Sequence, residues 1–140
     1  MANTLRLEIV TPEERTYSDD VELVVLPGIE GEIGVYPSHV PLLTELTPGE
    51  LRVTKNGKEI VLAVGEGFAE VTATHINVLT DMAVEETAID EAAVQAAIER
   101  AEAAMREREK MNDEEIATVD ASLRRSLAQL RVKRRRSGGV

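Results

Sequence analysis

The sequence contains no cysteine and no tryptophan, and its only Tyr or Phe residues are Tyr17, Tyr36 and Phe68. Without cysteine, the chain has no disulfide, no thiolate zinc site and no cysteine nucleophile. The scarcity of aromatic rings argues against the stacking platforms that bind single-stranded nucleic acid. A hydrophobic core must therefore be built from the aliphatic residues, which supply most of the 43% hydrophobic content.

Long apolar runs are also missing. No stretch approaches the roughly 20 apolar residues that cross a bilayer. The first residues, M-A-N-T-L-R, lack the basic and then apolar pattern of a signal peptide. We therefore expect any membrane association to be indirect, through a partner protein.

The common catalytic and cofactor-binding patterns are absent as well. Gly28, Gly31 and Gly34 stand three residues apart, a spacing that fits neither a dinucleotide-binding fold nor a phosphate-binding loop. His39 and His75 are too few for an ordinary zinc site without cysteine. The acidic residues are scattered along the chain. The sequence thus predicts a protein that is not catalytic by itself and has no metal or other cofactor.

The net charge of −10 conceals two parts of opposite sign. Residues 121–140 contain no acid and seven basic residues, whereas residues 1–120 hold nine basic and all 26 acidic ones, a net charge of −17. A tail of opposite sign to its body is typical of an interaction segment. An acidic protein, an anionic lipid surface and nucleic acid are all compatible with it, and a solvated basic helix end is the plainer alternative. The basic residues are Arg124, Arg125, Arg131, Lys133, Arg134, Arg135 and Arg136.

Residues 1–84 have the pattern of short strands. Leu5, Leu7 and Ile9 alternate with polar residues, as in a half-buried strand. Asn56-Gly57 between two β-rich runs predicts a tight hairpin, and residues 28–41 are too rich in Gly and Pro for a helix. Many short strands at close spacing predict an antiparallel sandwich or barrel of about ten strands. The clearest expected strands cover residues 5–9, 21–26, 51–53, 60–64, 68–72 and 76–79.

Residues 85–140 are expected to form two helices, because Gly and Pro are absent from 83–136 and Ala is abundant. The first helix should begin near Thr87, with Thr87 and Asp90 forming a capping box. The second should begin at Asn112, an amide cap followed by acids. The expected apolar stripe of the first helix is Ala93, Ala97, Ala101 and Met105, with Val94 and Ile98 beside them. That of the second helix is Ile116, Val119, Leu123, Leu127 and Leu130.

These helices should pack as an antiparallel hairpin, giving an α+β chain with a sandwich domain (1–84) and a hairpin domain (85–140). The stripes are narrow, so the hairpin is marginal alone and needs a surface on which to rest. A marginal, docked element is a candidate moving part.

Residues 31–43 read G-E-I-G-V-Y-P-S-H-V-P-L-L. This run resembles the signature loop of ATP synthase epsilon subunits, with Ser38 where that family usually has Gly. Further short motifs match the family in the same order, so the resemblance extends from Leu5 to Val132. They lie at residues 10–13, 26–28, 47–49, 67–71, 78–83, 89–90 and 128–132.

The resemblance implies a rotor subunit of a bacterial F-type ATP synthase, on the cytoplasmic face of the plasma membrane. The sandwich would bind the gamma subunit and stand on the ring of c subunits, coupling proton flow to ATP synthesis in the catalytic head. The expected contact residues for the c ring and gamma are Glu32, Tyr36, Ser38 and His39.

The resemblance further implies that the hairpin switches between a folded form and an extended form that blocks ATP hydrolysis. The extended form would contact the beta and alpha subunits of the head, where an acidic loop of beta would meet the basic tail. We expect that neutralising Arg124 and Arg125 weakens inhibition. The proposed inhibitory contacts are Arg124, Arg125, Arg131, Lys133, Arg134 and Arg135.

Some family members bind ATP in the folded hairpin through the motif [IL]-D-x-x-R-A and later arginines. Asp90, Arg100 and Arg125 match this pattern here. Ala93 and Gln129, however, replace two of its arginines. A phosphate clamp without these guanidinium groups loses bidentate, charge-assisted contacts. Regulatory ATP is therefore expected to bind weakly or not at all.

Two other readings remain open from the sequence. A free-standing adaptor for an unrelated acidic partner would show no affinity for gamma, and an enzyme would need a clustered pocket. A nucleic-acid role for the tail would require strongly salt-dependent binding, which the charge of the body opposes. The sequence does not decide whether the hairpin rests folded or extended.

Overall fold

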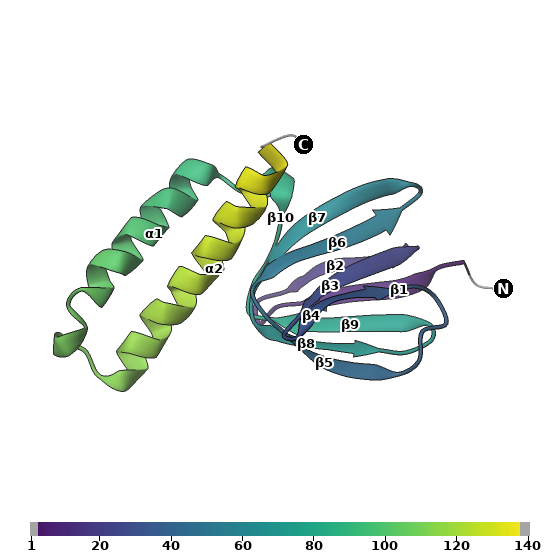
Figure 1. The fold of residues 1–140 in the computed structure, drawn as a ribbon, viewed down its shortest axis with the longest axis horizontal. Helices are drawn as coiled ribbons and strands as arrows, with labels where there is room; N and C mark the ends of the chain where they lie inside the picture. Colours follow the sequence, from purple (N-terminus) through teal and green to yellow (C-terminus); the bar gives the residue numbers. More distant parts are fainter. Residues whose placement is uncertain (1–2, 138–140) are drawn as a thin grey trace.

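The protein's structure, a computed structural model, describes residues 3–137 and contains ten strands followed by two helices (Figure 1). The strands are β1 (Leu5–Val10), β2 (Arg15–Val21), β3 (Leu23–Gly28), β4 (Gly31–Val35), β5 (Leu42–Leu46), β6 (Gly49–Lys55), β7 (Lys58–Val64), β8 (Gly67–Val71), β9 (His75–Thr80) and β10 (Ala83–Glu85). The helices are α1 (Glu91–Met105) and α2 (Asp113–Ser137), with single 3-10 turns η1 (Glu86–Ala88) and η2 (Arg108–Lys110). The predicted α+β class is confirmed.

The strands form one sheet that folds over on itself (Figure 1). Their order is β10-β7-β6-β3-β5-β8-β9-β1-β2, and β4 pairs with β3 beside this path. Pairing among the described strands is antiparallel except between β1 and β9, which run parallel. These two strands are far apart in sequence, which leaves room for the long crossover that a parallel pair requires.

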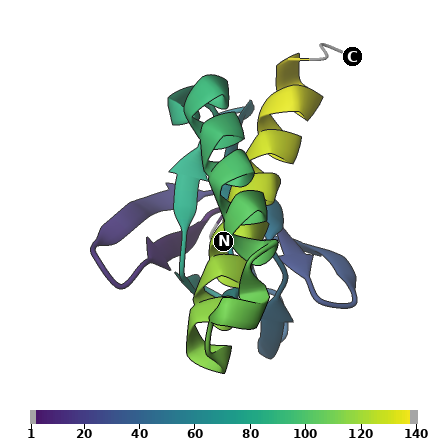
Figure 2. The same cartoon turned by 90° about the vertical axis from the view of Figure 1, so that its left-hand side faces the viewer.

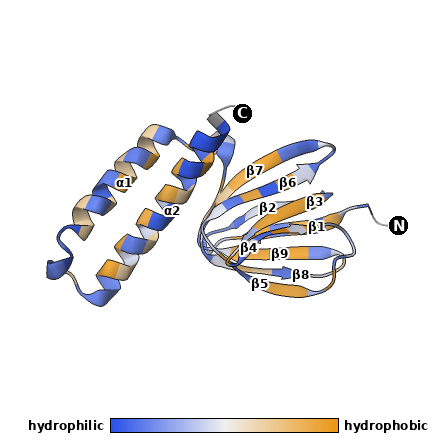
Figure 3. Ribbon diagram, viewed as in Figure 1, coloured by the Kyte–Doolittle hydropathy of each residue, from blue (hydrophilic) through white to orange (hydrophobic). Residues whose placement is uncertain are grey.

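The core lies inside this folded sheet and is aliphatic. Leu5, Leu7 and Ile9 of β1 are buried, while Arg6 and Glu8 between them are not, which confirms the predicted alternation. Each fully buried Leu, Ile or Val side chain contributes about 1.5–3 kcal/mol. Hydrophobic stretches run along the strands in Figure 3, whereas hydrophobic and hydrophilic residues alternate along α2. The sandwich core cluster contains no residue of the two helices.

The hairpin predicted at Asn56-Gly57 is confirmed. These residues have φ of 52° and 75°, the left-handed values that a two-residue turn between twisted strands requires. Lys55 and Lys58 are paired across the turn. The register of β6 and β7 is fixed by this turn, and both strands form the surface on which α2 rests.

Two strands, β2 and β4, and one strand boundary do not follow the sequence pattern. β2 is mostly polar and half-exposed, without alternating apolar residues. β4 lies inside the Gly- and Pro-rich region 28–41, where only a lack of helix was predicted. The run expected at 21–26 is divided, because Val21 ends β2 and Leu23 begins β3.

The start of the first helix differs from the prediction. Thr87 lies inside the 3-10 turn η1 and does not form a capping box. Asp90 is the N-cap of α1 instead, and its carboxylate accepts a hydrogen bond from the backbone N–H of Ala93 at 3.2 Å. Asp caps helices well because its side chain is short enough to reach an unpaired N–H of the first turn.

The cap predicted for the second helix is confirmed. The backbone N–H of Glu115 donates to the side-chain oxygen of Asn112 at 2.8 Å. The Glu115 carboxylate in turn accepts from the backbone N–H of Asn112 at 3.3 Å. These reciprocal bonds form a capping box at the start of α2.

The helical hairpin rests on the sandwich through α2, and α1 packs on the far side of α2. Figure 2, viewed from the helix side, shows α1 in front of α2. A second hydrophobic cluster, separate from the sandwich core, joins the hairpin to the sandwich. Its buried members are Val61, Ala63, Met82, Ile89, Val94, Ile98, Ala128, Leu130 and Val132. The described residues include no helix long and apolar enough to cross a membrane.

The buried faces of both helices follow the predicted stripes only in part. On α1, Val94, Ile98 and Ala101 are buried as expected, whereas Ala93 is exposed. On α2, Ala128 is completely buried, whereas Leu127 is 40% exposed. The cause is that α2 has neighbours on two sides, so a single stripe does not describe its contacts.

Candidate functional site

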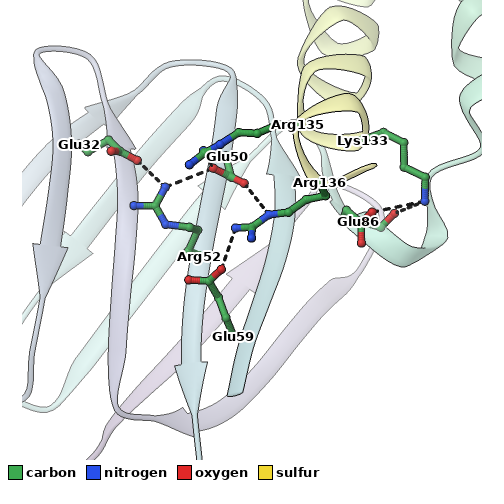
Figure 4. A network of polar contacts seen from close by, with 8 residues as sticks. All are labelled: Glu32, Glu50, Arg52, Glu59, Glu86, Lys133, Arg135 and Arg136. Atoms are coloured by element: carbon green, nitrogen blue, oxygen red, sulfur yellow. Dashed lines mark hydrogen bonds and ion pairs between the residues drawn. The ribbon is translucent and has the colours of Figure 1, made fainter. Parts of the chain in front are cut away.

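Three arginines surround one carboxylate where the end of α2 meets β6 (Figure 4). The Glu50 side chain is only 9% exposed. Its Oε2 accepts from Nη1 of Arg52 at 3.2 Å and also from Nη1 of Arg135, and its Oε1 accepts from Nε of Arg136 at 3.2 Å. Two further acids balance the charge. The complete Glu50 network comprises Glu32, Glu50, Glu59, Arg52, Arg135 and Arg136.

Arg52 is the central cation of this network. The same Nη1 that contacts Glu50 also donates to Glu32 at 2.8 Å. Burial opposes the charged form of Arg52, but its bonds to Glu32 and Glu50 outweigh this and hold the pKa of Arg52 above its ordinary value. The Arg52 guanidinium thus connects Glu32 of β4 to Glu50, the carboxylate that accepts from the arginines of α2.

Four other basic residues of α2 also have acidic partners. Their side chains are 24–59% exposed, and exposed pairs are worth about 0–1 kcal/mol each. Several such weak pairs together favour the docked hairpin but leave its docking reversible. The pairs are Arg124 with Glu66, Arg125 with Asp81, Lys133 with Glu86, and Arg134 with Glu91.

Arg131 differs from these residues. Within residues 3–137 no acidic side chain pairs with it, and its guanidinium donates only to the carbonyl of Pro48, at 3.5 Å. It borders a surface groove of about 790 Å³ between α2 and the turn after β5. The groove is lined by Thr47, Pro48, Arg124, Leu127, Leu130, Arg131 and Arg134.

The expected contact residues of the signature loop lie in two different settings. Tyr36 is 63% exposed, and Ser38 is also exposed. His39 is half-buried, with its Nδ1 2.6 Å from the carbonyl oxygen of Val40. Glu32 lies in β4 and joins the Glu50 network. Ser38 has φ of 68°, a left-handed conformation that explains why glycine is usual there in the family it resembles.

An exposed apolar surface on the sandwich was not predicted. Leu43, Phe68 and Leu79 are 70%, 53% and 57% exposed. Phe68 of β8 pairs with Leu79 of β9. On the other side of β8, the direct partner of Phe68 is Glu45 of β5, so Leu43 lies diagonal to Phe68. We call these three residues the outer apolar strip. The sequence signal was available: Phe68 stands at an outward position of β8, next to the inward-facing Ala69.

The residues that match an ATP motif are not joined by contacts among the described residues. Asp90 uses its carboxylate to cap α1. Arg125 donates to Asp81 at 3.2 Å, and Arg100 lies exposed on α1. No group of acids and histidines in the part of the chain that the structure describes has the arrangement of a metal site.

Asp19 and Lys55 link β2 to β6 and show the other marked shifts in pKa. A hydrogen bond from Lys55 lowers the pKa of Asp19, and the same bond raises the pKa of Lys55. Burial, followed by the charge of Asp19, raises the pKa of Tyr17. These groups connect β2 to β6 by side chains and lie outside the Glu50 network.

The fold is thus a β-sandwich with an aliphatic core, on which a hydrophobic cluster and a set of ion pairs hold a helical hairpin. The model of the ATP synthase delta/epsilon chain β-sandwich domain matches residues 4–86. The chain belongs to this ATP synthase delta/epsilon family.

Similar proteins agree with this assignment. The chain is 42% identical over 131 residues to an ATP synthase epsilon chain of Laribacter hongkongensis, covering 92% of each. It is 48% identical over 103 residues to one of Desulfosudis oleivorans, covering 73% of this chain and 77% of the relative. A chain of the Euglena gracilis mitochondrial ATP synthase has the same fold, with a TM-score of 0.69 at 24% identity, over 89% of this chain and 78% of that one.

Proposed function

We propose that the chain is a non-catalytic subunit of the central stalk of a bacterial, proton-translocating ATP synthase. Its sandwich binds the gamma subunit and the c ring, on the cytoplasmic face of the plasma membrane. Its hairpin, when extended, contacts the beta and alpha subunits and restrains ATP hydrolysis. The family membership and the names of the bacterial relatives support this proposal.

The exposure of the outer apolar strip is the main observation that supports binding to the rotor. Three large apolar side chains on adjacent strands are exposed, on a sandwich whose other outward positions are largely polar. Grouped exposed apolar residues mark surfaces that bind other proteins. The nearby loop with Tyr36, Ser38 and His39 offers further contacts, so strip and loop together present a surface for gamma and the c ring.

Replacing both Phe68 and Leu79 with Ser is expected to weaken binding to gamma by at least about 30-fold. The few residues that dominate an interface contribute about 2 kcal/mol or more, so one such residue in the pair accounts for this loss. Calorimetric titration of the purified gamma subunit measures this. Leu127→Ser, which alters an exposed apolar residue of α2, is the matched control and should bind normally. Unchanged affinity in the double variant would show that gamma does not bind the strip, and a parent chain that does not bind gamma at all would favour the adaptor alternative.

The basic face of α2 supports the second part of the proposal. In the docked hairpin, the cations of α2 other than Arg131 are paired with acids of the same chain, mostly in exposed positions. An acidic surface on another subunit can replace these partners at little net cost. Exchange of ion-pair partners therefore gives a physical route between a folded and an extended hairpin.

ATP is not expected to be needed for the folded hairpin. Asp90 and Arg125, two of the residues that match the nucleotide motif, have partners within the chain. The docked form is supported by the second hydrophobic cluster and by the Glu50 network, neither of which involves a ligand.

A further inference from the structure

A continuous series of contacts connects the β4 segment to the last turns of α2 (Figure 4). Glu32 accepts from Arg52 at 2.8 Å, Arg52 also donates to Glu50 at 3.2 Å, and Glu50 in turn accepts from Arg135 and Arg136. Glu32 is 58% exposed, so an outside group can reach it, whereas Arg52 is only 19% exposed. One end of the series is therefore open to solvent and the other holds the hairpin.

Arg52 links the two carboxylates. Its Nη1 carries two N–H groups and donates to both Glu32 and Glu50, so the position of this guanidinium depends on both acids. Arg52 and Arg135 also donate to the same oxygen of Glu50, Oε2, which brings the two cations close together. Without Glu32, Glu50 is the one acidic partner left to Arg52 among the described residues, and the guanidinium is drawn towards Glu50 and Arg135.

Charge acts in the same direction. The network contains three carboxylates and three guanidinium groups. Neutralising Glu32 leaves an excess positive charge beside Arg135 and Arg136. Like charges repel, and the repulsion is strongest where solvent is partly excluded. Both effects weaken the hold of the sandwich on the end of α2.

We infer that Glu32 is a binding position for a basic side chain of a partner protein, and that its occupation loosens the docked hairpin through Arg52 and Glu50. The inference deepens the proposed function and rests on it only for the existence of a partner at β4. Because coupling is reciprocal, release of the hairpin strengthens binding of the basic group at Glu32. Attachment to the rotor and release of the hairpin are thereby linked.

The test uses a thiol reporter in the full-length chain. Ala128 on α2 is completely buried, and the native sequence has no cysteine. In an Ala128→Cys background, the rate at which a thiol reagent labels this single cysteine reports how often α2 lifts away. Glu32→Gln imitates occupation of the carboxylate. It is expected to raise the labelling rate about 2- to 5-fold, as the loss of one partly exposed pair implies.

Glu30→Gln is the matched control, since it removes the same charge from an exposed turn residue two positions away. It should change the rate by less than about 1.5-fold, since removing an unpaired surface charge has little effect. The effect of Glu32→Gln should also disappear in a Glu50→Gln chain and in an Arg135→Gln/Arg136→Gln chain, because the series of contacts between Glu32 and α2 is broken in both. Equal effects of the Glu32 and Glu30 variants, or an undiminished effect of Glu32→Gln in both backgrounds, would overturn the inference.

A second reporter separates hairpin release from general unfolding. Ala69 is completely buried in the sandwich core. Labelling of an Ala69→Cys chain should be unaffected by Glu32→Gln, and a parallel rise there would contradict release of the hairpin alone. These measurements need no other subunit, so their outcome is independent of whether the chain binds gamma or restrains hydrolysis.

Discussion

Replacing Glu50 with Lys is expected to raise the labelling rate of the Ala128→Cys reporter roughly 30- to 150-fold. The substitution places a fourth cation among Arg52, Arg135 and Arg136 and removes their common acceptor. Breaking a buried charge pair costs about 3–5 kcal/mol. Since the arginines here are partly exposed, we expect about 2–3 kcal/mol, which corresponds to that change in rate.

The control for this variant is Glu13→Lys, which makes the same change of charge at an exposed turn residue with no ion pair in the described structure. Its labelling rate should remain within about twofold of the parent, as is usual for surface substitutions. The sandwich should stay folded in both variants, because its core cluster has no hairpin residue. A Glu50→Lys chain whose α2 remains as protected as the parent's would show that the hydrophobic cluster alone holds the hairpin.

The largest loss of stability is expected from Gly67→Ala. A Cβ at Gly67 would lie 1.9 Å from the carbonyl oxygen of Leu79 and 2.8 Å from Cα of Thr80. Both are backbone atoms of β9, so no side chain can rotate away and the β8–β9 pair must separate. We expect a destabilisation above about 4 kcal/mol, the range reached when a core element is forced apart. Urea unfolding measures it.

Gly34→Ala provides the comparison. A Cβ at Gly34 would meet no atom within 4 Å. Alanine also restricts the unfolded chain more than glycine, so this variant should be unchanged or slightly more stable, by up to about 1 kcal/mol. A Gly67→Ala protein as stable as the Gly34→Ala protein would mean that β8 and β9 are not as closely spaced as described.

The sequence predicted the fold well where one local signal dominates. The alternation in β1, the Asn56-Gly57 turn and the Asn112 cap depend on neighbouring residues, and all three are confirmed. The predicted start of α1 was wrong because Thr87 and Asp90 are both good N-cap residues, and the local sequence does not decide which of them caps the helix. The choice is set by the turn η1, which rests against the sandwich.

The candidate site was only partly accessible from sequence. The basic residues of α2 were identified by composition, but Glu50 and Arg52 were not, since neither stands out from the many charged residues of the strands. Their importance comes from the docking of α2 against β6, which joins residues about 85 positions apart. The outer apolar strip likewise depends on pairing between β5, β8 and β9.

The most direct test of the account is ATP hydrolysis by the alpha-beta-gamma head, titrated with the full-length chain and with a chain ending after Glu86. The shorter chain keeps the whole sandwich core and loses α1 and α2. We expect both chains to bind the head and only the full-length chain to slow hydrolysis. Equal inhibition by both chains would contradict the role of the hairpin, and binding by neither would contradict attachment to the rotor.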